Sequence, residues 1–267
     1  MSTVTSADGT SIAYEQEGDG PAIVLVDGAL CFRDAGPMRS IAEALRGRLT
    51  VVLYDRRGRG ASSDSLADPA ARADAVAREI EDLAALIDAT GGSARLFGMS
   101  SGGGLALAAA AALGADRVPA VAVYEPPYLP DPMLPSAEAY TRQLLDALAA
   151  DDPAAAVELF LRRVGVPEAG IEGMRSSPGW EATLALAPTL GYDDAAMGDS
   201  RVPDDLLQAI SVPVLGLAGE QTPDFLRLGA EGVASGAQDG TFEIVAGQTH
   251  DVSGEALAPH LLRFAGV

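Results

Sequence analysis

Short, unbroken runs of aliphatic residues recur along the chain between longer stretches that mix apolar and polar positions. Uninterrupted apolar runs are typical of parallel strands that helices cover on both faces. The N-terminal part differs, because the turn pair Asp8–Gly9 precedes residues 11–18 and predicts a β-hairpin. The other predicted strands are residues 22–28, 49–55, 94–100, 120–127, 212–219 and 241–247.

Helical patterns separate these strands, most clearly in residues 68–92. Asp68 can cap this helix, Pro69 suits its first turn and Gly91 suits its end. Its apolar positions fall on one face: Val76, Ile80, Leu83, Leu86 and Ile87. Strands that alternate with helices predict an α/β fold built on a parallel sheet.

Strand signals are missing between residues 130 and 202, where the pattern predicts helices at 137–150, 153–165 and 179–197. An insertion of this length between two sheet strands is typical of a lid or cap. We therefore expect a core of residues 1–129 and 203–267. The helical cap, residues 130–202, would be inserted between the sixth and the seventh strand.

The segment Gly98-Met99-Ser100-Ser101-Gly102 joins a predicted strand to a helix rich in leucine and alanine. A sharp strand-to-helix turn packs its backbone closely and favours glycine two residues before and after a strained, exposed serine. The N-terminus of the helix also offers free N–H groups to an anion. We expect Ser100 to be a nucleophile and the Ser101 N–H to bind an oxyanion. The alternative is that these small residues only connect the strand to the helix and take no part in catalysis.

A nucleophilic serine needs a base, and the chain has two histidines. His250 follows the last predicted strand in a loop, at the sheet edge where α/β proteins present functional groups. His260 lies within a C-terminal amphipathic pattern and is expected to be a structural helix residue. His250 is therefore the predicted base.

Four motifs together resemble the α/β-hydrolase family over nearly the whole chain. They are "LVDGAL" (25–30) and "YDRRGRGASS" (54–63) after the third and fourth strands, "GMSSG" (98–102) at the nucleophile turn, and "GQTH" (247–250) in the base loop. The resemblance implies an eight-stranded, mostly parallel sheet with helices on both faces, a helical cap and Ser100–His250 chemistry. It also implies that the N–H of Ala29, or else of Gly28, is the second oxyanion donor.

The chain departs from the family pattern at two positions. Asp27 stands where the family usually has histidine, and it is either a loop anchor or a substrate contact. Thr222 stands where the acid usually follows the seventh strand. Glu125, after the sixth strand, is our first choice for the acid because some family members carry theirs there. The alternatives are Asp224 and then Glu220.

Composition excludes several other functions. Acidic residues number 38 against 18 basic ones, and the net charge of −20 disfavours nucleic-acid and membrane partners. All the basic residues are arginine, which excludes Walker-type phosphate loops and lysine-dependent catalysis. We expect that the protein needs no metal or other cofactor and that it is cytoplasmic. The sequence leaves open whether it forms a homodimer. For Arg56, Arg57 and Arg59, structural ion pairing is favoured over binding a substrate carboxylate.

These observations predict a serine hydrolase that cleaves an ester or lactone of a mostly apolar small molecule through an acyl-enzyme. The Asp27–Gly28 loop and Glu125 are similar to a lactone-hydrolysing branch typified by the zearalenone lactonases. Other triad reactions remain open, namely carbon–carbon bond hydrolysis, perhydrolysis and natural-product cyclisation, as does a non-enzymatic ligand-binding role. The predicted pocket residues are Met99, Tyr128, Met133, Leu134 and Trp180.

Overall fold

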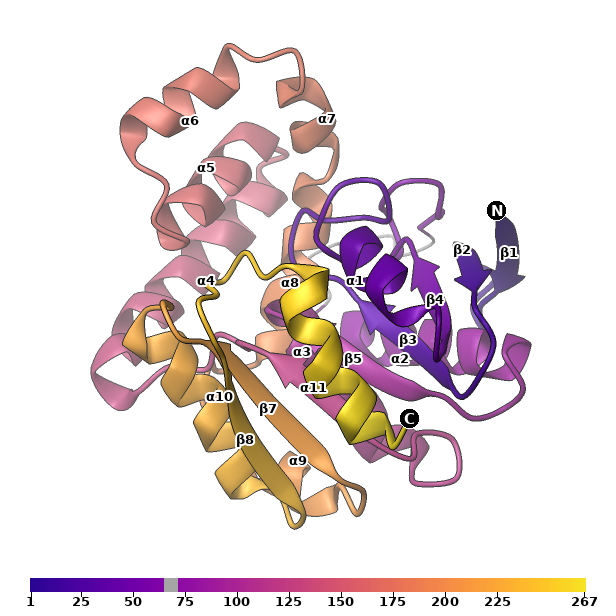
Figure 1. Cartoon of the computed structure of the whole chain (residues 1–267). Helices are drawn as coiled ribbons and strands as arrows, with labels where there is room; N and C mark the ends of the chain where they lie inside the picture. Colours follow the sequence, from indigo (N-terminus) through magenta and orange to yellow (C-terminus); the bar gives the residue numbers. More distant parts are fainter. Residues whose placement is uncertain (65–71) are drawn as a thin grey trace.

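The computed structural model describes residues 1–64 and 72–267, and within them eight strands form one sheet (Figure 1). The strand order is β1-β2-β4-β3-β5-β6-β7-β8. β2 pairs antiparallel with both β1 and β4, and the remaining pairs are parallel. The bounds are β1 (Ser2–Thr5), β2 (Ser11–Glu17), β3 (Ala22–Val26), β4 (Thr50–Tyr54), β5 (Arg95–Met99), β6 (Val121–Tyr124), β7 (Val214–Gly219) and β8 (Gly240–Val245).

Helices cover both faces of this sheet, which confirms the predicted fold class. One face carries α1 (Met38–Leu45) and α11 (Gly254–Ala265). The other carries α2 (Arg72–Ala89), α3 (Ser101–Leu113), α9 (Asp204–Ala209) and α10 (Asp224–Gly236). The predicted start of the second helix, at Asp68 and Pro69, lies outside the described residues.

Helix α3 is the most enclosed helix of the core, because glycine, alanine and leucine make up all of it after Ser101. It packs against strands on one side and against α8 (Leu190–Met197) on another. A Cβ at Gly104 would lie 2.8 Å from the carbonyl oxygen of Ala196 in α8. The small residues thus allow a helix from the inserted segment to rest on the helix that follows Ser100.

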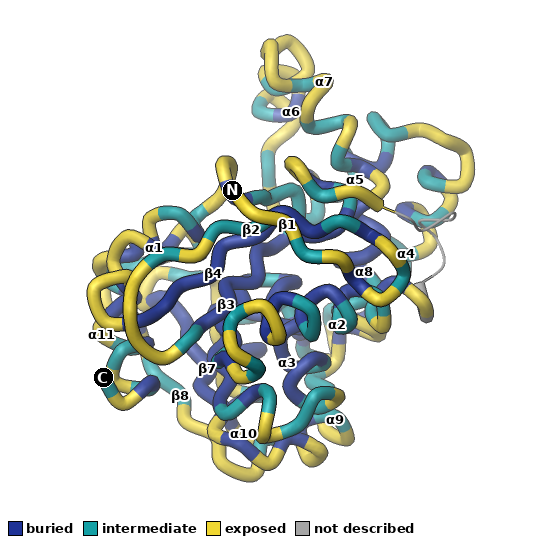
Figure 2. Tube along the Cα trace, turned by 90° about the vertical axis from the view of Figure 1, so that its right-hand side faces the viewer, coloured by how far each residue is buried: buried dark blue, intermediate teal, exposed yellow. Residues whose placement is uncertain are grey.

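The rest of the insertion projects from the core as α4 (Leu134–Ala149), α5 (Pro153–Arg163), α6 (Glu168–Arg175) and α7 (Trp180–Ala185) (Figure 1). These helices share an apolar cluster of their own, and α6 and α7 are largely exposed (Figure 2). The prediction of a single helix over residues 179–197 is wrong. This segment is divided into α7, the 3₁₀ turn η2 (Ala187–Thr189) and α8, because Pro188 has no N–H to donate to a continuous helix.

The contact between β7 and α10 allows a matched test of packing. A Cβ at Gly216 would lie 2.3 Å from the carbonyl oxygen of Ala230. Gly216→Ala must therefore push α10 away, and we expect the free energy of unfolding to fall by about 1–3 kcal/mol or more. Gly173→Ala, at an open position of α6, should raise it by about 0.5–1 kcal/mol. Urea unfolding measures both, and a neutral Gly216→Ala would contradict the packing described.

Candidate active site

Ser100 lies between β5 and α3 in a strained conformation, with φ +54° and ψ −129°. Its N–H donates to the carbonyl oxygen of Tyr124 at 2.9 Å, and its own carbonyl accepts from the Gly103 N–H at 2.9 Å. These hydrogen bonds hold the serine in a conformation that L-residues seldom adopt.

The two glycines around Ser100 are required by close backbone contacts. A Cβ at Gly98 would lie 2.3 Å from the carbonyl oxygen of Gly102. A Cβ at Gly102 would lie 2.3 Å from the carbonyl oxygen of Val26 in β3. A residue with a side chain fits at neither position, in agreement with the reasoning from the sequence.

The loop after β3 lies beside Ser100. A Cβ at Gly28 would lie 3.1 Å from the Ser100 Cβ, and the Gly28 N–H donates to the Asp27 carboxylate at 3.1 Å. Within the part of the chain that the structure describes, the N–H groups of Ala29 and Ser101 have no acceptor. Ala29 and Ser101 are therefore better placed than Gly28 to offer a free donor.

Glu125 and His250 are in direct contact. The His250 Nδ1 lies 2.6 Å from the Glu125 Oε2, and the Gly219 N–H donates to the Oε1 at 2.7 Å. The Glu125 side chain is fully buried, whereas 41% of the His250 side chain is exposed. A buried carboxylate that accepts the Nδ1–H leaves Nε2 free to accept a proton.

Backbone strain gathers around these groups. Of the five non-glycine residues with positive φ in the described ranges, three lie here: Leu30, Ser100 and Glu125. Strained conformations persist only where the surroundings hold them, and they are common at functional sites.

The alternative acids lie elsewhere. Glu220 accepts the Gly247 N–H at 2.8 Å, and the exposed Asp224 pairs with Arg227 at 2.8 Å. Neither shows a hydrogen bond or ion pair with His250 among the described residues. At the usual acid position, the buried Thr222 hydroxyl has no partner in that same part of the chain.

The structure does not join every member of the predicted site. Across residues 1–64 and 72–267, no hydrogen bond connects Ser100 with His250. Catalytic hydrogen bonds are often long without substrate and shorten when it binds.

The other histidine, His260, lies in α11 and pairs with Glu243.

The five predicted pocket residues pack with four different apolar clusters. Met99 packs with the core beneath α1 and α11, and Tyr128 packs with the core on the α3 side. Met133 and Leu134 form a small cluster with neighbours of α4, while Trp180 belongs to the cluster of the projecting helices. A cavity of about 300 Å³ between α4 and residues 198–200 includes none of them.

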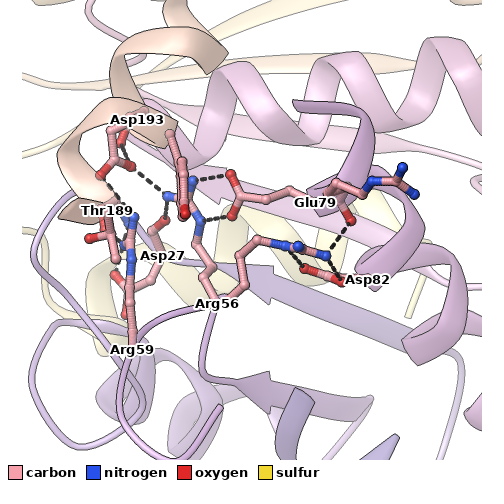
Figure 3. Close-up of polar contacts among 12 residues, drawn as sticks. Asp27, Arg56, Arg59, Glu79, Asp82, Thr189 and Asp193 are labelled. Atoms are coloured by element: carbon pink, nitrogen blue, oxygen red, sulfur yellow. Dashed lines mark hydrogen bonds and ion pairs between the residues drawn. The ribbon is translucent and has the colours of Figure 1, made fainter. Parts of the chain in front are cut away.

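The three neighbouring arginines are buried and ion-paired, as Figure 3 shows for Arg56 and Arg59, which confirms the predicted ion pairing. Arg56 donates to both carboxylate oxygens of Glu79 at 2.7 Å. Arg57 donates to both oxygens of Asp82 at 2.7 and 2.8 Å. The guanidinium groups of Arg56 and Arg57, together with that of Arg59, are thus part of the protein interior and not an open anion site.

A model of the Alpha/beta hydrolase family matches residues 23–260 of this sequence. The chain belongs to the alpha/beta hydrolase family. Its fold is similar to an alpha/beta hydrolase from Sphaerobacter thermophilus DSM 20745, with a TM-score of 0.85 and 42% identity over 99% of this chain and 100% of that one. Membership of the alpha/beta hydrolases supports hydrolase activity.

More distant alpha/beta hydrolases share the fold. A thermophilic esterase from Thermogutta terrifontis has a TM-score of 0.71 and 24% identity, over 99% of this chain and 97% of that one. The enol-lactonase from Burkholderia xenovorans LB400 has a TM-score of 0.64 and 20% identity, over 98% and 96%. No curated protein matches the sequence.

The described residues of this alpha/beta hydrolase contain neither a metal-binding cluster nor a helix suited to span a membrane. Residues 1–64 and 72–267 contain no group of three or more histidine, cysteine or acidic side chains arranged to hold a metal ion. In the same ranges, no helix has the length and apolar character needed to cross a membrane.

Asp27, in the loop after β3, is a buried titratable group beside Ser100. Burial raises the pKa of its carboxyl to about 7, although the nearby Arg59 and the Gly28 N–H favour the ionised form. The fold therefore favours the protonated carboxyl. This contribution to stability is complete below the ordinary value of 3.8 and is lost as the pH rises through about 7.

Asp27→Asn tests this linkage, because the amide oxygen can still accept the Gly28 N–H and carries no charge. We expect the variant to gain stability over the wild type between pH 5 and pH 8, by up to a few kcal/mol at about 1.4 kcal/mol per pKa unit. Urea unfolding at both pH values measures it. Asp116→Asn removes an exposed carboxylate as the control. An equal effect of Asp27→Asn at pH 5 and pH 8 would show that Asp27 ionises normally.

Proposed function

We propose that this chain is a serine hydrolase that cleaves an ester or lactone bond of a mostly apolar small molecule. The observation that carries the proposal is the 2.6 Å contact between the buried Glu125 and His250. It supplies an oriented base on the same sheet edge as the strained Ser100. A serine with an oriented histidine is the arrangement that acyl transfer requires.

In the proposed reaction, Ser100 Oγ attacks the carbonyl carbon while His250 Nε2 takes its proton. The N–H groups of Ala29 and Ser101 stabilise the resulting oxyanion. His250 then gives the proton to the leaving oxygen as the carbon–oxygen bond breaks. A water molecule, activated by His250, releases the acid and restores Ser100, while Glu125 stabilises the imidazolium throughout.

The apolar character of the proposed substrate is supported by the surroundings of the oxyanion loop. Ala29 and Leu30 pack against the apolar cluster of the projecting helices, as do Tyr140 and Trp180. The substrate carbonyl would therefore lie near an apolar surface. An ester and a lactone present the same carbonyl to Ser100, so the proposal includes both.

Labelling with a fluorophosphonate tests the nucleophile and the base. We expect one adduct on Ser100 in the wild type, no adduct in Ser100→Ala and strongly slowed labelling in His250→Ala. Turnover of p-nitrophenyl esters should fall on the order of 10⁶-fold in Ser100→Ala. His260→Ala is the matched control and should label normally. A folded wild type without an adduct would refute the proposal.

Substitution of each carboxyl identifies the acid. Glu125→Gln keeps the size of the side chain but cannot hold the same histidine tautomer, and kcat should fall on the order of 10³–10⁴-fold. Glu220→Gln and Asp224→Asn should leave kcat nearly unchanged. A greater loss of kcat in either control than in Glu125→Gln would assign the role of the acid to that control position.

Product analysis separates the proposed reaction from other chemistry of the same triad. Release of an acid and an alcohol, or of a hydroxy acid from a lactone, is the expected result. Labelling of Ser100 without cleavage of any ester or lactone would contradict the proposed substrate class and favour carbon–carbon bond hydrolysis, perhydrolysis or cyclisation.

A further inference from the structure

We propose that Asp193, on helix α8 of the inserted segment, is a positioning residue that holds both oxyanion donors in place. The inserted helix would then set the geometry of the site. This inference rests on the proposed function, because it concerns the same oxyanion.

The first link runs from Asp193 to the nucleophile turn. The Ser101 hydroxyl donates to the Asp193 Oδ1 at 2.8 Å, although the two residues are 92 positions apart. Ser101 is the first residue of α3, and α8 packs on this helix at Gly104. The side chain of Ser101 is thus fixed to α8, while its N–H stays free for a ligand.

The second link runs to the loop after β3 (Figure 3). Arg59 donates to the Asp193 Oδ2 at 2.8 Å and to the Gly28 carbonyl at 2.6 Å. The Gly28 carbonyl and the Ala29 N–H belong to one planar peptide group, so the direction of the carbonyl fixes the direction of the N–H. Arg59 therefore orients the Ala29 donor, and Asp193 holds Arg59.

Arg56 strengthens the same link. It donates to the Asp193 Oδ1 at 2.6 Å and to the Asp27 carbonyl at 3.0 Å, so two successive peptide groups of the loop are held. Burial opposes ionisation of Asp193, but Arg59 and Arg56 hold the pKa of its carboxyl below the ordinary value. Hydrogen bonds between charged groups are short and strong in such surroundings.

A simpler role for Asp193 would be to neutralise buried arginines. Glu79 separates the two roles, because its carboxylate also neutralises Arg56 through two hydrogen bonds. Among the described residues, however, Glu79 makes no hydrogen bond or ion pair with Ser101 or Arg59, whereas Asp193 pairs with Arg59. If charge alone mattered, loss of either carboxylate would have the same effect.

The experiment compares wild type, Asp193→Asn, Glu79→Gln and Ser101→Ala in the full chain. Hydrolysis of p-nitrophenyl butyrate gives kcat and KM. Inhibition by phenylboronic acid reports the tetrahedral adduct, in which a boronate oxygen takes the place of the oxyanion. Thermal unfolding reports stability separately.

For Asp193→Asn we expect kcat to fall about 10- to 100-fold, because small displacements of catalytic groups have effects of this size. KM should change by less than about threefold, since the loss concerns the transition state. The inhibition constant of phenylboronic acid should rise in proportion to the fall in kcat. Glu79→Gln should lower the melting temperature, and its losses of kcat and boronate affinity should be clearly smaller than those of Asp193→Asn, because Arg59 keeps its bonds to Asp193 and to the Gly28 carbonyl.

Ser101→Ala removes one bond to Asp193 without leaving a buried charge, so it decides the question if Asp193→Asn does not fold. We expect its kcat and boronate affinity to fall about 3- to 10-fold at unchanged KM. Unchanged values in Ser101→Ala, or equal losses in Asp193→Asn and Glu79→Gln, would overturn the inference. A wild type with neither turnover nor a fluorophosphonate adduct would refute the proposed function, and the inference with it.

Discussion

Buried guanidinium groups are the constraint on which the loops around Ser100 depend. A charge without water is tolerated only when partners surround it, and loss of one partner leaves an uncompensated charge. Arg56 and Arg59 follow β4 and satisfy this requirement with carboxylates from α2 and α8 and with carbonyls of the loop after β3. Three segments that are remote in sequence are thereby fixed against one another. The resulting arrangement is polar, yet it is as closed to solvent as the apolar core around it.

The sheet could be predicted from the sequence because its signals are local. Continuous apolar runs mark strands that are buried on both faces, and a glycine two positions either side of Ser100 marks a turn without room for side chains. The acidic partners of the buried arginines gave no such signal. Glu79 occupies a charged position in the helical pattern of α2 and would be expected in solvent, but it is buried because its partner Arg56 comes from another part of the chain.

The predicted site depends on contacts of the same distant kind. The sequence offered Glu125, Asp224 and Glu220 as acids because each follows a strand, and no local pattern tells which one meets a histidine 125 positions away. Positive φ at Glu125 was also beyond prediction, since the residue is not glycine. The five predicted pocket residues belong to different apolar clusters, because apolar residues of similar type fill both the core and the projecting helices, and the sequence pattern does not tell which of them pack together.

The link from Asp193 to Arg56 joins residues 137 positions apart, and this separation has a consequence for the order of folding. Loop closure over such a distance costs entropy that local contacts do not require, so long-range contacts form slowly. A chain emerging from the ribosome contains Ser100 and both arginines well before α8 is made. Until then, the loop that offers Ala29 lacks its anchor on α8. On the proposed function, the oxyanion-binding geometry is therefore assembled late, after the strands that carry its parts have already been synthesised.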